Sequence, residues 1–140
     1  MTTLTGRCLC GSSTYVAESE PLITAICHCT SCQRQTGTAY SLVVGVPRDA
    51  FRLEGEHVST FVTTSEESGN PAERKFCAAC GSPLATLAED LPQLALIKAG
   101  TLDDRAVLEP GVEVHCSSAL PFAVREQVER ARFPAGLPAE

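Results

Sequence analysis

The stretches Gly-Arg-Cys-Leu-Cys-Gly (residues 6–11) and Phe-Cys-Ala-Ala-Cys-Gly (residues 76–81) each contain a close pair of cysteines followed by a glycine. Each pair can supply two corners of a tetrahedral metal site. Together the pairs offer four sulfur ligands: Cys8, Cys10, Cys77 and Cys80. A metal ion shared by both pairs would join the start of the chain to its middle and stabilise the fold as a long-loop crosslink does. We therefore predict a closed structural zinc site with four thiolates.

Two other interpretations of these pairs are open. The cysteines could be small buried apolar residues, or Cys77 and Cys80 could form a redox-active Cys-x2-Cys motif. A redox motif of the thioredoxin type would lie in a βαβ pattern, which the sequence around Cys77 lacks, and it would leave Cys8 and Cys10 unexplained. The spacing therefore favours metal binding over both.

A second cluster, Cys-His-Cys-Thr-Ser-Cys (residues 27–32), has three sulfurs within six residues. Side chains alternate between faces in an extended segment, so Cys27 and Cys29 point together while His28 points away, into a hydrogen-bonding or core position. The turn that follows returns Cys32 to their side. Three protein ligands leave the fourth position of a zinc ion to water or substrate, which is typical of a catalytic site. We predict a second, catalytic zinc ion on these three cysteines.

The eighth cysteine, Cys116, ends a predicted strand over residues 112–116. On that strand it would share a face with Val114 as a small buried apolar residue, whereas Glu113 and His115 would face the other way. A fourth ligand or a nucleophile is the other interpretation of Cys116.

The rest of the chain is typical of one β-rich globular domain. It has 140 residues, of which 44% are hydrophobic and 20% charged, and this is enough for a single core. Short β-type runs are separated by Gly, Pro, Ser and Asn. The runs cover residues 13–17, 22–27, 40–46, 57–63, 74–77, 84–87, 94–98 and 112–116. We predict one domain over residues 1–140, with its core at about 4–133, built from antiparallel sheets.

Residues 122–132 depart from this pattern. Val124, Val128 and Ala131 recur at helical spacing, with charged residues on another face. We predict a short C-terminal helix here, which Pro134 stops.

Charge and cysteine content restrict the partners and the compartment. The formal net charge is -6 and no block concentrates the 11 basic residues, so neither a nucleic-acid-binding stripe nor a membrane-surface patch is expected. The N-terminus has no signal-like segment, and no run reaches the roughly 18 apolar residues of a membrane span. In a reducing cytosol, eight cysteines are expected to be thiolates on metal and not disulfides. We expect a soluble cytoplasmic protein.

The cysteine stretches also carry a resemblance to a known family. The pattern consists of residues 6–11, residues 27–32 and residues 74–84, with agreement at residues 100–104 and 110–115. It resembles the glutathione-dependent formaldehyde-activating enzyme family, also called the centromere protein V family, from about Gly6 to Phe122. The resemblance implies a β-tent fold of antiparallel sheets, and it places the structural and the catalytic zinc on the same cysteines as the spacing does. It also implies carbon–sulfur lyase chemistry, in which formaldehyde and glutathione combine reversibly as S-hydroxymethylglutathione. In this chemistry, zinc could lower the pKa of a substrate thiol and polarise the aldehyde oxygen.

Few residues other than the cysteines suggest a role in the reaction. Arg34 and Gln35 follow Cys32 closely enough to line its open position, and we predict that Arg34 helps to bind an anionic substrate. Adjacent carboxylates such as Asp103 and Asp104 more often form a turn or cap than an acid–base pair.

Two further functions remain open at this level. In a non-catalytic zinc-binding scaffold, the second zinc would be closed by Cys116 or His115, or would be missing. A zinc-stabilised redox enzyme, related in fold to methionine sulfoxide reductases, would need a reactive thiol outside the structural site, and Cys116 is its candidate. Metal occupancy and coordination distinguish the scaffold from the lyase.

Overall fold

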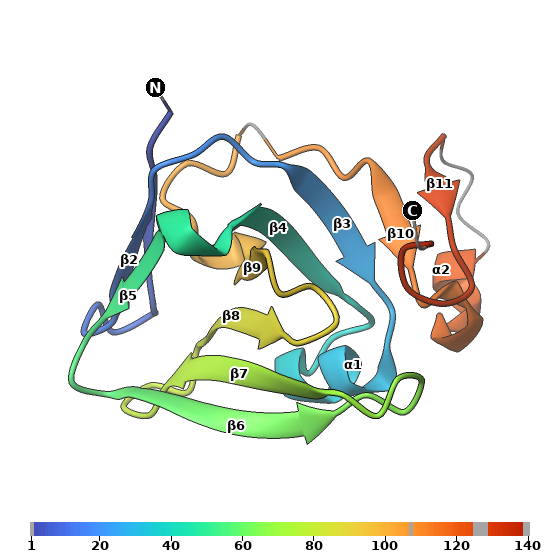
Figure 1. Cartoon of the computed structure of the whole chain (residues 1–140), viewed down its shortest axis with the longest axis horizontal. Coiled ribbons are helices and arrows are strands. Elements are labelled where there is room, and N and C mark those ends of the chain that lie inside the picture. The colour runs from blue at the N-terminus through green and yellow to red at the C-terminus, as the bar shows by residue number, and fades with distance from the viewer. Residues whose placement is uncertain (1, 107, 125–128, 139–140) are drawn as a thin grey trace.

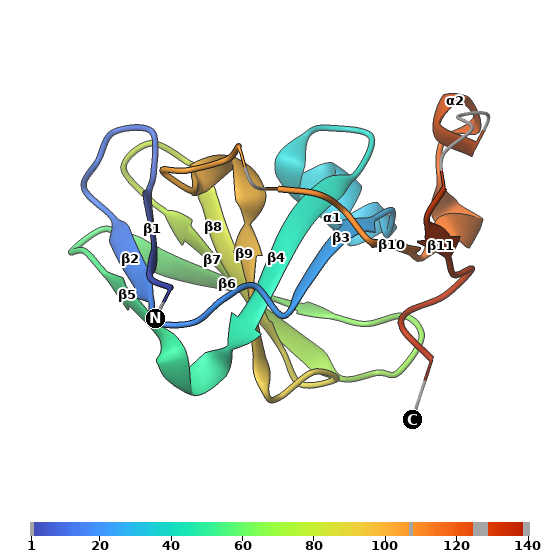
Figure 2. The same cartoon turned by 90° about the horizontal axis from the view of Figure 1, so that it is seen from above.

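A computed structural model describes residues 2–106, 108–124 and 129–138 (Figures 1 and 2). The described chain is mainly β, as the sequence predicts. Its strands are β1 (Leu4–Arg7), β2 (Thr14–Ala17), β3 (Ile23–Cys27), β4 (Ser41–Pro47), β5 (Phe51–Glu54), β6 (Val58–Thr64), β7 (Pro71–Cys77), β8 (Pro83–Ala88), β9 (Leu94–Lys98), β10 (Val112–Val114) and β11 (Ala131–Arg132). Its helices are α1 (Thr30–Thr36) and α2 (Pro121–Val124), with short 3-10 turns η1 (Arg48–Ala50), η2 (Ala99–Thr101) and η3 (Cys116–Ser118).

The strands form two sheets. The smaller sheet has the order β1-β2-β5, and the larger has the order β11-β10-β3-β4-β9-β8-β7-β6. Figure 1 shows the larger sheet curving from β11 through β3 and β4 round to β7 and β6, with α1 inside the curve. The prediction of antiparallel sheets holds for most pairs. The exceptions among the described strands are β3 with β10 and β10 with β11, which pair in parallel.

The core lies where the smaller sheet packs on the larger one. Tyr15 from β2 and Val44, Leu84 and Ile97 from β4, β8 and β9 belong to one buried cluster. Burying a large apolar side chain contributes about 1.5–3 kcal/mol to folding, so this cluster is a main source of stability. Gly6 on β1 must be a glycine, because a Cβ at this position would collide with the Tyr15 ring.

Within the described residues, the helices are too short and too polar to cross a bilayer.

The predicted C-terminal helix is wrong over part of its length. Within the described residues helix α2 covers Pro121–Val124, and Ala131 and Arg132 form strand β11, paired with Val112 and Glu113 of β10. Residues 125–128 of the predicted helix lie outside the described residues. Hydrogen bonds to a neighbouring strand outweigh helical periodicity here, because local propensity is a weak preference that tertiary pairing overrides.

Helix α1 was not predicted, yet it positions half of the candidate site. The Cys29 side chain caps its N-terminus by accepting from Cys32 N–H. Gly37, with φ 68°, ends the helix in the left-handed conformation that favours glycine. The chain can therefore turn from α1 straight into β4.

Candidate functional site

The first cysteine cluster joins two turns of the fold. Cys8 and Cys10 follow β1, and Cys77 and Cys80 lie where β7 turns into β8. The four Sγ atoms lie within 4.8 Å of one another, with 3.6 Å between Cys8 and Cys10 and 3.9 Å between Cys10 and Cys77. Four sulfurs at the usual Zn–S distance of about 2.3 Å stand roughly 3.8 Å apart, so the cluster fits a tetrahedral metal ion. The four residues expected to form the closed site are therefore brought together, and they could hold a metal ion.

Serine hydroxyls adjoin these sulfurs. Ser12 Oγ lies 3.1 Å from Cys10 Sγ and 3.4 Å from Cys77 Sγ, and Ser82 Oγ lies 3.2 Å from Cys80 Sγ. Hydrogen bonding from Ser12 lowers the pKa of Cys77 to about 5, and hydrogen bonding from Ser82 lowers the pKa of Cys80 to about 7. Both shifts favour the thiolate form that binds metal. These serines were not predicted from the sequence.

The second cluster forms where β3 passes into α1. Cys27 ends β3, Cys29 lies in the turn and Cys32 lies in the first turn of α1. Cys32 Sγ is 3.6 Å from Cys27 Sγ, and the three Sγ atoms all lie within 4.8 Å of one another. Among the described residues, no further Cys, His, Asp or Glu joins this group. Three sulfurs thus converge as expected, and a metal ion on them would keep one coordination position for another ligand.

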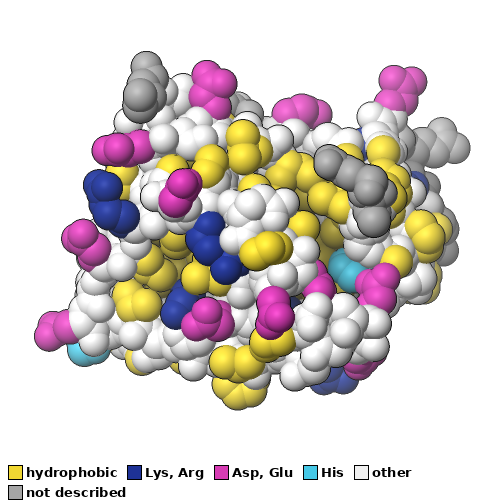
Figure 3. All heavy atoms as spheres, viewed as in Figure 1, with side chains coloured by type: hydrophobic (Ala, Val, Ile, Leu, Met, Phe, Trp, Pro, Cys, Tyr) yellow, Lys and Arg dark blue, Asp and Glu magenta, His cyan; other side chains and the backbone are white. Residues whose placement is uncertain are grey.

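A cavity of about 710 Å³ opens over the second cluster. The three cysteines line it with side chains from β4, β7, β8 and β9, and residues 134–137 border it as well. Three exposed acidic residues, Glu66, Glu67 and Asp90, also border this cavity. Figure 3 shows acidic side chains scattered over this side of the molecule, with uncharged side chains and a few basic ones between them. A ligand can therefore reach the second cluster, whereas the first cluster does not line this cavity.

Two buried cations adjoin the second cluster. Arg74 on β7 is 7% exposed, and its Nη1 donates to Cys32 Sγ at 3.6 Å. Lys98, at the end of β9, is 6% exposed, and its Nζ donates to Ser41 Oγ at 2.9 Å. Both side chains line the cavity. Buried charges need partners, so these two mark the cavity as a place for negative charge.

The two cations act on the sulfurs electrostatically. Hydrogen bonds from Cys27 and Cys29 lower the pKa of Cys32, and the charges of Lys98 and Arg74 lower it further. The shared hydrogen bonds, together with burial, raise the pKa of Cys27. Burial lowers the pKa of Lys98, and the Cys32 charge opposes this effect. The three sulfurs share negative charge that the cations stabilise.

Strand β7 serves both clusters. It carries Arg74 to the second cluster and ends at Cys77 of the first. Its pairing with β8 shifts register between Lys75 and Phe76, and this shift lies between Arg74 and Cys77. In the sequence Arg74 is only the start of a motif, and its position beside Cys32 was not predicted.

His28 points away from the three sulfurs, as predicted. It is 1% exposed, and its Nε2 lies 2.7 Å from Oε1 of the buried Glu113. Arg130 and Arg132 donate to Oε2 of the same carboxylate at 2.8 and 2.9 Å. Burial alone would raise the pKa of Glu113, but the hydrogen bonds from His28, Arg130 and Arg132 lower it to about 2. This network ties the turn between Cys27 and Cys29 to the C-terminal segment.

We expect Glu113→Gln to destabilise the protein by about 3 kcal/mol at pH 7, the free energy equivalent of lowering the Glu113 pKa from 4.5 to about 2. A carboxylate with a lowered folded pKa stabilises above its unfolded pKa. The difference should therefore be constant from pH 8 to pH 5 and shrink as the pH falls below about 4.5. Urea unfolding of both proteins measures it. The exposed Glu109→Gln control should change stability by less than about 0.5 kcal/mol, and an equal effect of both variants would contradict the network's role.

The prediction that Cys116 ends a strand as a small buried residue is wrong. Strand β10 ends at Val114, and His115 adopts φ 54°, which breaks the alternation before Cys116 enters η3. Cys116 is half-buried, and its Sγ groups with His28 and Glu113, not with the three sulfurs of the second cluster. His115 lines the cavity but is not part of that cluster either. Neither residue is placed as a fourth ligand in this arrangement.

The remaining predicted residues fall into two groups. Arg34 is exposed and lines a groove next to the cavity, not the cavity itself, so its role in substrate binding stays a prediction. Asp103 and Asp104 make local contacts: Asp103 Oδ2 accepts from Thr5 Oγ1 at 2.7 Å, and Asp104 Oδ1 accepts from Ala106 N–H at 3.1 Å. The Asp104 contact is of the turn type that was expected, whereas the Asp103 contact joins residues that are 98 positions apart in the sequence. All eight cysteines are free of disulfides.

Comparisons with known proteins agree with this geometry. A sequence model described as glutathione-dependent formaldehyde-activating enzyme matches residues 3–118. A crystal structure of a Rhodobacter sphaeroides protein is similar to this chain, with a TM-score of 0.57 and 16% sequence identity, covering 92% of this chain and 98% of that one. At this identity the similarity shows the fold alone. No curated protein matches the chain.

Proposed function

Because the chain belongs to the glutathione-dependent formaldehyde-activating enzyme family, we propose that it is a zinc-dependent carbon–sulfur lyase. Its substrate would be a small thiol adduct of the S-hydroxymethylglutathione type. In this proposal Cys8, Cys10, Cys77 and Cys80 hold a structural zinc ion. Cys27, Cys29 and Cys32 hold a second, catalytic zinc ion.

The observation that carries this proposal is the placement of three sulfurs at a cavity that also contains two buried cations. Three thiolates and one divalent metal ion have a formal charge of minus one. Arg74 and Lys98 make the local charge plus one, so a thiolate ligand would neutralise the site. The cavity is thus suited to a substrate sulfur in its anionic form.

The reaction is a reversible addition. A substrate thiolate attacks the carbon of formaldehyde, a C–S bond forms, the C=O π electrons move to oxygen, and the proton lost by the thiol ends on that oxygen. Zinc at this position would supply Lewis acidity toward the sulfur or the aldehyde oxygen. Arg74 and Lys98 would keep the sulfur anionic, and the N–H groups of Lys98 Nζ could donate to the developing alkoxide. The burial of Arg74 and Lys98 strengthens these interactions, because charges interact more strongly away from bulk water.

We expect the zinc-loaded protein to accelerate exchange between free glutathione and S-hydroxymethylglutathione above the spontaneous rate. Exchange spectroscopy with ¹³C-formaldehyde measures this rate at equilibrium, where no net turnover is needed. Removing the more accessible metal with a chelator should return exchange to the spontaneous rate, and adding zinc should restore it. A fully loaded protein that leaves exchange unchanged would instead support the non-catalytic zinc-binding scaffold.

A further inference from the structure

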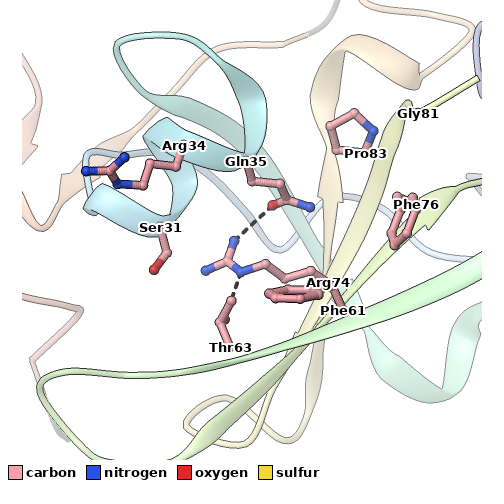
Figure 4. Close-up of a pocket in the computed structure, with 9 residues that line it drawn as sticks. All are labelled: Ser31, Arg34, Gln35, Phe61, Thr63, Arg74, Phe76, Gly81 and Pro83. Carbon is pink, nitrogen blue, oxygen red and sulfur yellow. Dashed lines mark hydrogen bonds between the residues drawn. The ribbon is translucent and has the colours of Figure 1, made fainter.

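A second hollow adjoins the cavity over Cys27, Cys29 and Cys32. It is a groove of about 480 Å³ between α1 and strands β6 and β7 (Figure 4). Ser31, Thr63 and Arg74 line both the groove and the cavity, so the two spaces meet at these residues. A molecule with its sulfur at the cysteines can therefore extend into the groove.

Arg74 stands at this junction with part of its hydrogen-bonding capacity unused. Its Nε donates to Thr63 Oγ1 at 2.9 Å, and its Nη1 donates to Gln35 Oε1 at 2.9 Å and to Cys32 Sγ. Among the described residues, Nη2 has no hydrogen-bond partner. Figure 4 shows this third nitrogen pointing toward the space beneath Ser31. A buried guanidinium held in place on two sides, with free N–H groups on the third, is suited to bind an acceptor.

The groove is positive and partly apolar. Its lining includes two arginines, Arg34 and Arg74, and no acidic residue. Phe61 lies directly opposite Arg74 in the β6–β7 pair, so both side chains are on the same face of the sheet, and Phe61 is 64% exposed. Phe76 adds a second aromatic wall. A carboxylate attached to a short aliphatic stem matches this lining.

We propose that this groove is a carboxylate subsite, in which Arg74 Nη2 and the exposed Arg34 bind an acid group of the same substrate whose sulfur lies at Cys27, Cys29 and Cys32. The inference rests on the proposed function in taking the substrate to be a thiol. Arg74 also contacts Cys32 Sγ, so the carboxylate must lie only a few bonds from the sulfur. The site then selects mercapto-carboxylic acids over neutral thiols of the same size.

Isothermal titration of the zinc-loaded protein with 3-mercaptopropionate and with 3-mercaptopropionamide tests this subsite. The two probes share the same carbon chain and thiol, and a neutral amide replaces the carboxylate that would enter the groove. The acid should bind wild type at least about tenfold more tightly than the amide, as expected for a charge-assisted contact with a buried guanidinium. Equal affinities, or no binding by either thiol, would overturn the subsite.

Variants locate the source of the preference. Arg74→Met, which keeps the stem and removes the charge, should bring the two affinities within about threefold of each other. Arg34 is exposed, so Arg34→Met should leave folding intact. It should reduce the preference for the acid over the amide by about two- to fivefold. Arg52→Met, on β5 in the smaller sheet and also exposed, is the matched control and should leave the preference unchanged. Metal analysis and circular dichroism of each variant confirm that only loaded, folded protein is compared.

Lys98→Met separates this inference from the nearest alternative. If the preference for the acid disappears in Lys98→Met and survives in Arg74→Met, the carboxylate lies in the cavity and the groove is not its subsite. The titration uses no formaldehyde, so it is independent of turnover. A protein that prefers the acid but does not accelerate exchange would support the subsite and contradict the proposed lyase activity. A protein that accelerates exchange but does not prefer the acid would support the lyase activity and contradict the subsite.

Discussion

Cys77→Ala is expected to leave the protein unable to fold. Cys77 is fully buried, it ends β7, and its sulfur lies with Cys10 Sγ and two other sulfurs in the first cluster. Binding of a structural zinc ion contributes on the order of 10 kcal/mol. The total stability of a domain is about 5–15 kcal/mol, so the loss of this site removes most or all of it. The variant should be largely insoluble, or should show no cooperative thermal transition by circular dichroism.

Cys116→Ala is the matched control for this result. Cys116 is a half-buried cysteine outside both cysteine clusters, and its replacement should cost no more than about 1 kcal/mol. Elemental analysis should find about two zinc ions per chain in wild type and in the control. A folded Cys77→Ala protein with the full zinc content would show that the first cluster is not a structural metal site.

Cys29→Ala is expected to abolish activity and keep the fold. Cys29 lies in a turn at the border of the cavity, outside the cluster of core residues, and its sulfur caps α1 through one hydrogen bond of 3.2 Å. Loss of such a cap costs about 1 kcal/mol. Zinc content should fall from about two ions per chain to about one, and the exchange of glutathione with its formaldehyde adduct should fall to the spontaneous rate.

Elemental analysis, circular dichroism and the exchange assay on the same preparation measure the three consequences of Cys29→Ala together. Loss of one zinc ion with an intact thermal transition supports a catalytic centre that is separate from the structural one. Unfolding of the variant would mean that the second cluster is structural as well. The lyase proposal would then lose its main support.

The cysteine clusters were predictable from sequence because their geometry is mostly local. In residues 27–32 strand alternation and one turn are enough to bring three sulfurs together, and the structure has them within 4.8 Å. The two pairs of the first cluster needed one further assumption, that a metal ion joins them across the sequence. His28 could be placed by the same alternation argument. The single-domain prediction for residues 1–140 stays a prediction.

Residues that reach the site through tertiary packing could not be predicted. Arg74 contacts Cys32 only because α1 lies inside the curve of the large sheet, and a motif gives no information about this arrangement. Lys98 ends an apolar strand, and whether its ammonium faces solvent or a cavity depends on the pairing of β9 with β4. The positive φ of His115 breaks the strand alternation, so Cys116 does not lie on the same face as Val114. A charged residue at an inward position of an apolar strand is the signal that could have identified Lys98.

If both clusters hold zinc, the shared strand β7 couples the two metal sites. The strand that places Arg74 beside Cys32 ends at Cys77 of the first cluster, so disorder at the first cluster would also disturb the second. A chain with zinc only at Cys27, Cys29 and Cys32 would lack the folding free energy of the first metal site. Zinc shortage at the first cluster should therefore lower the amount of folded protein and not only its activity.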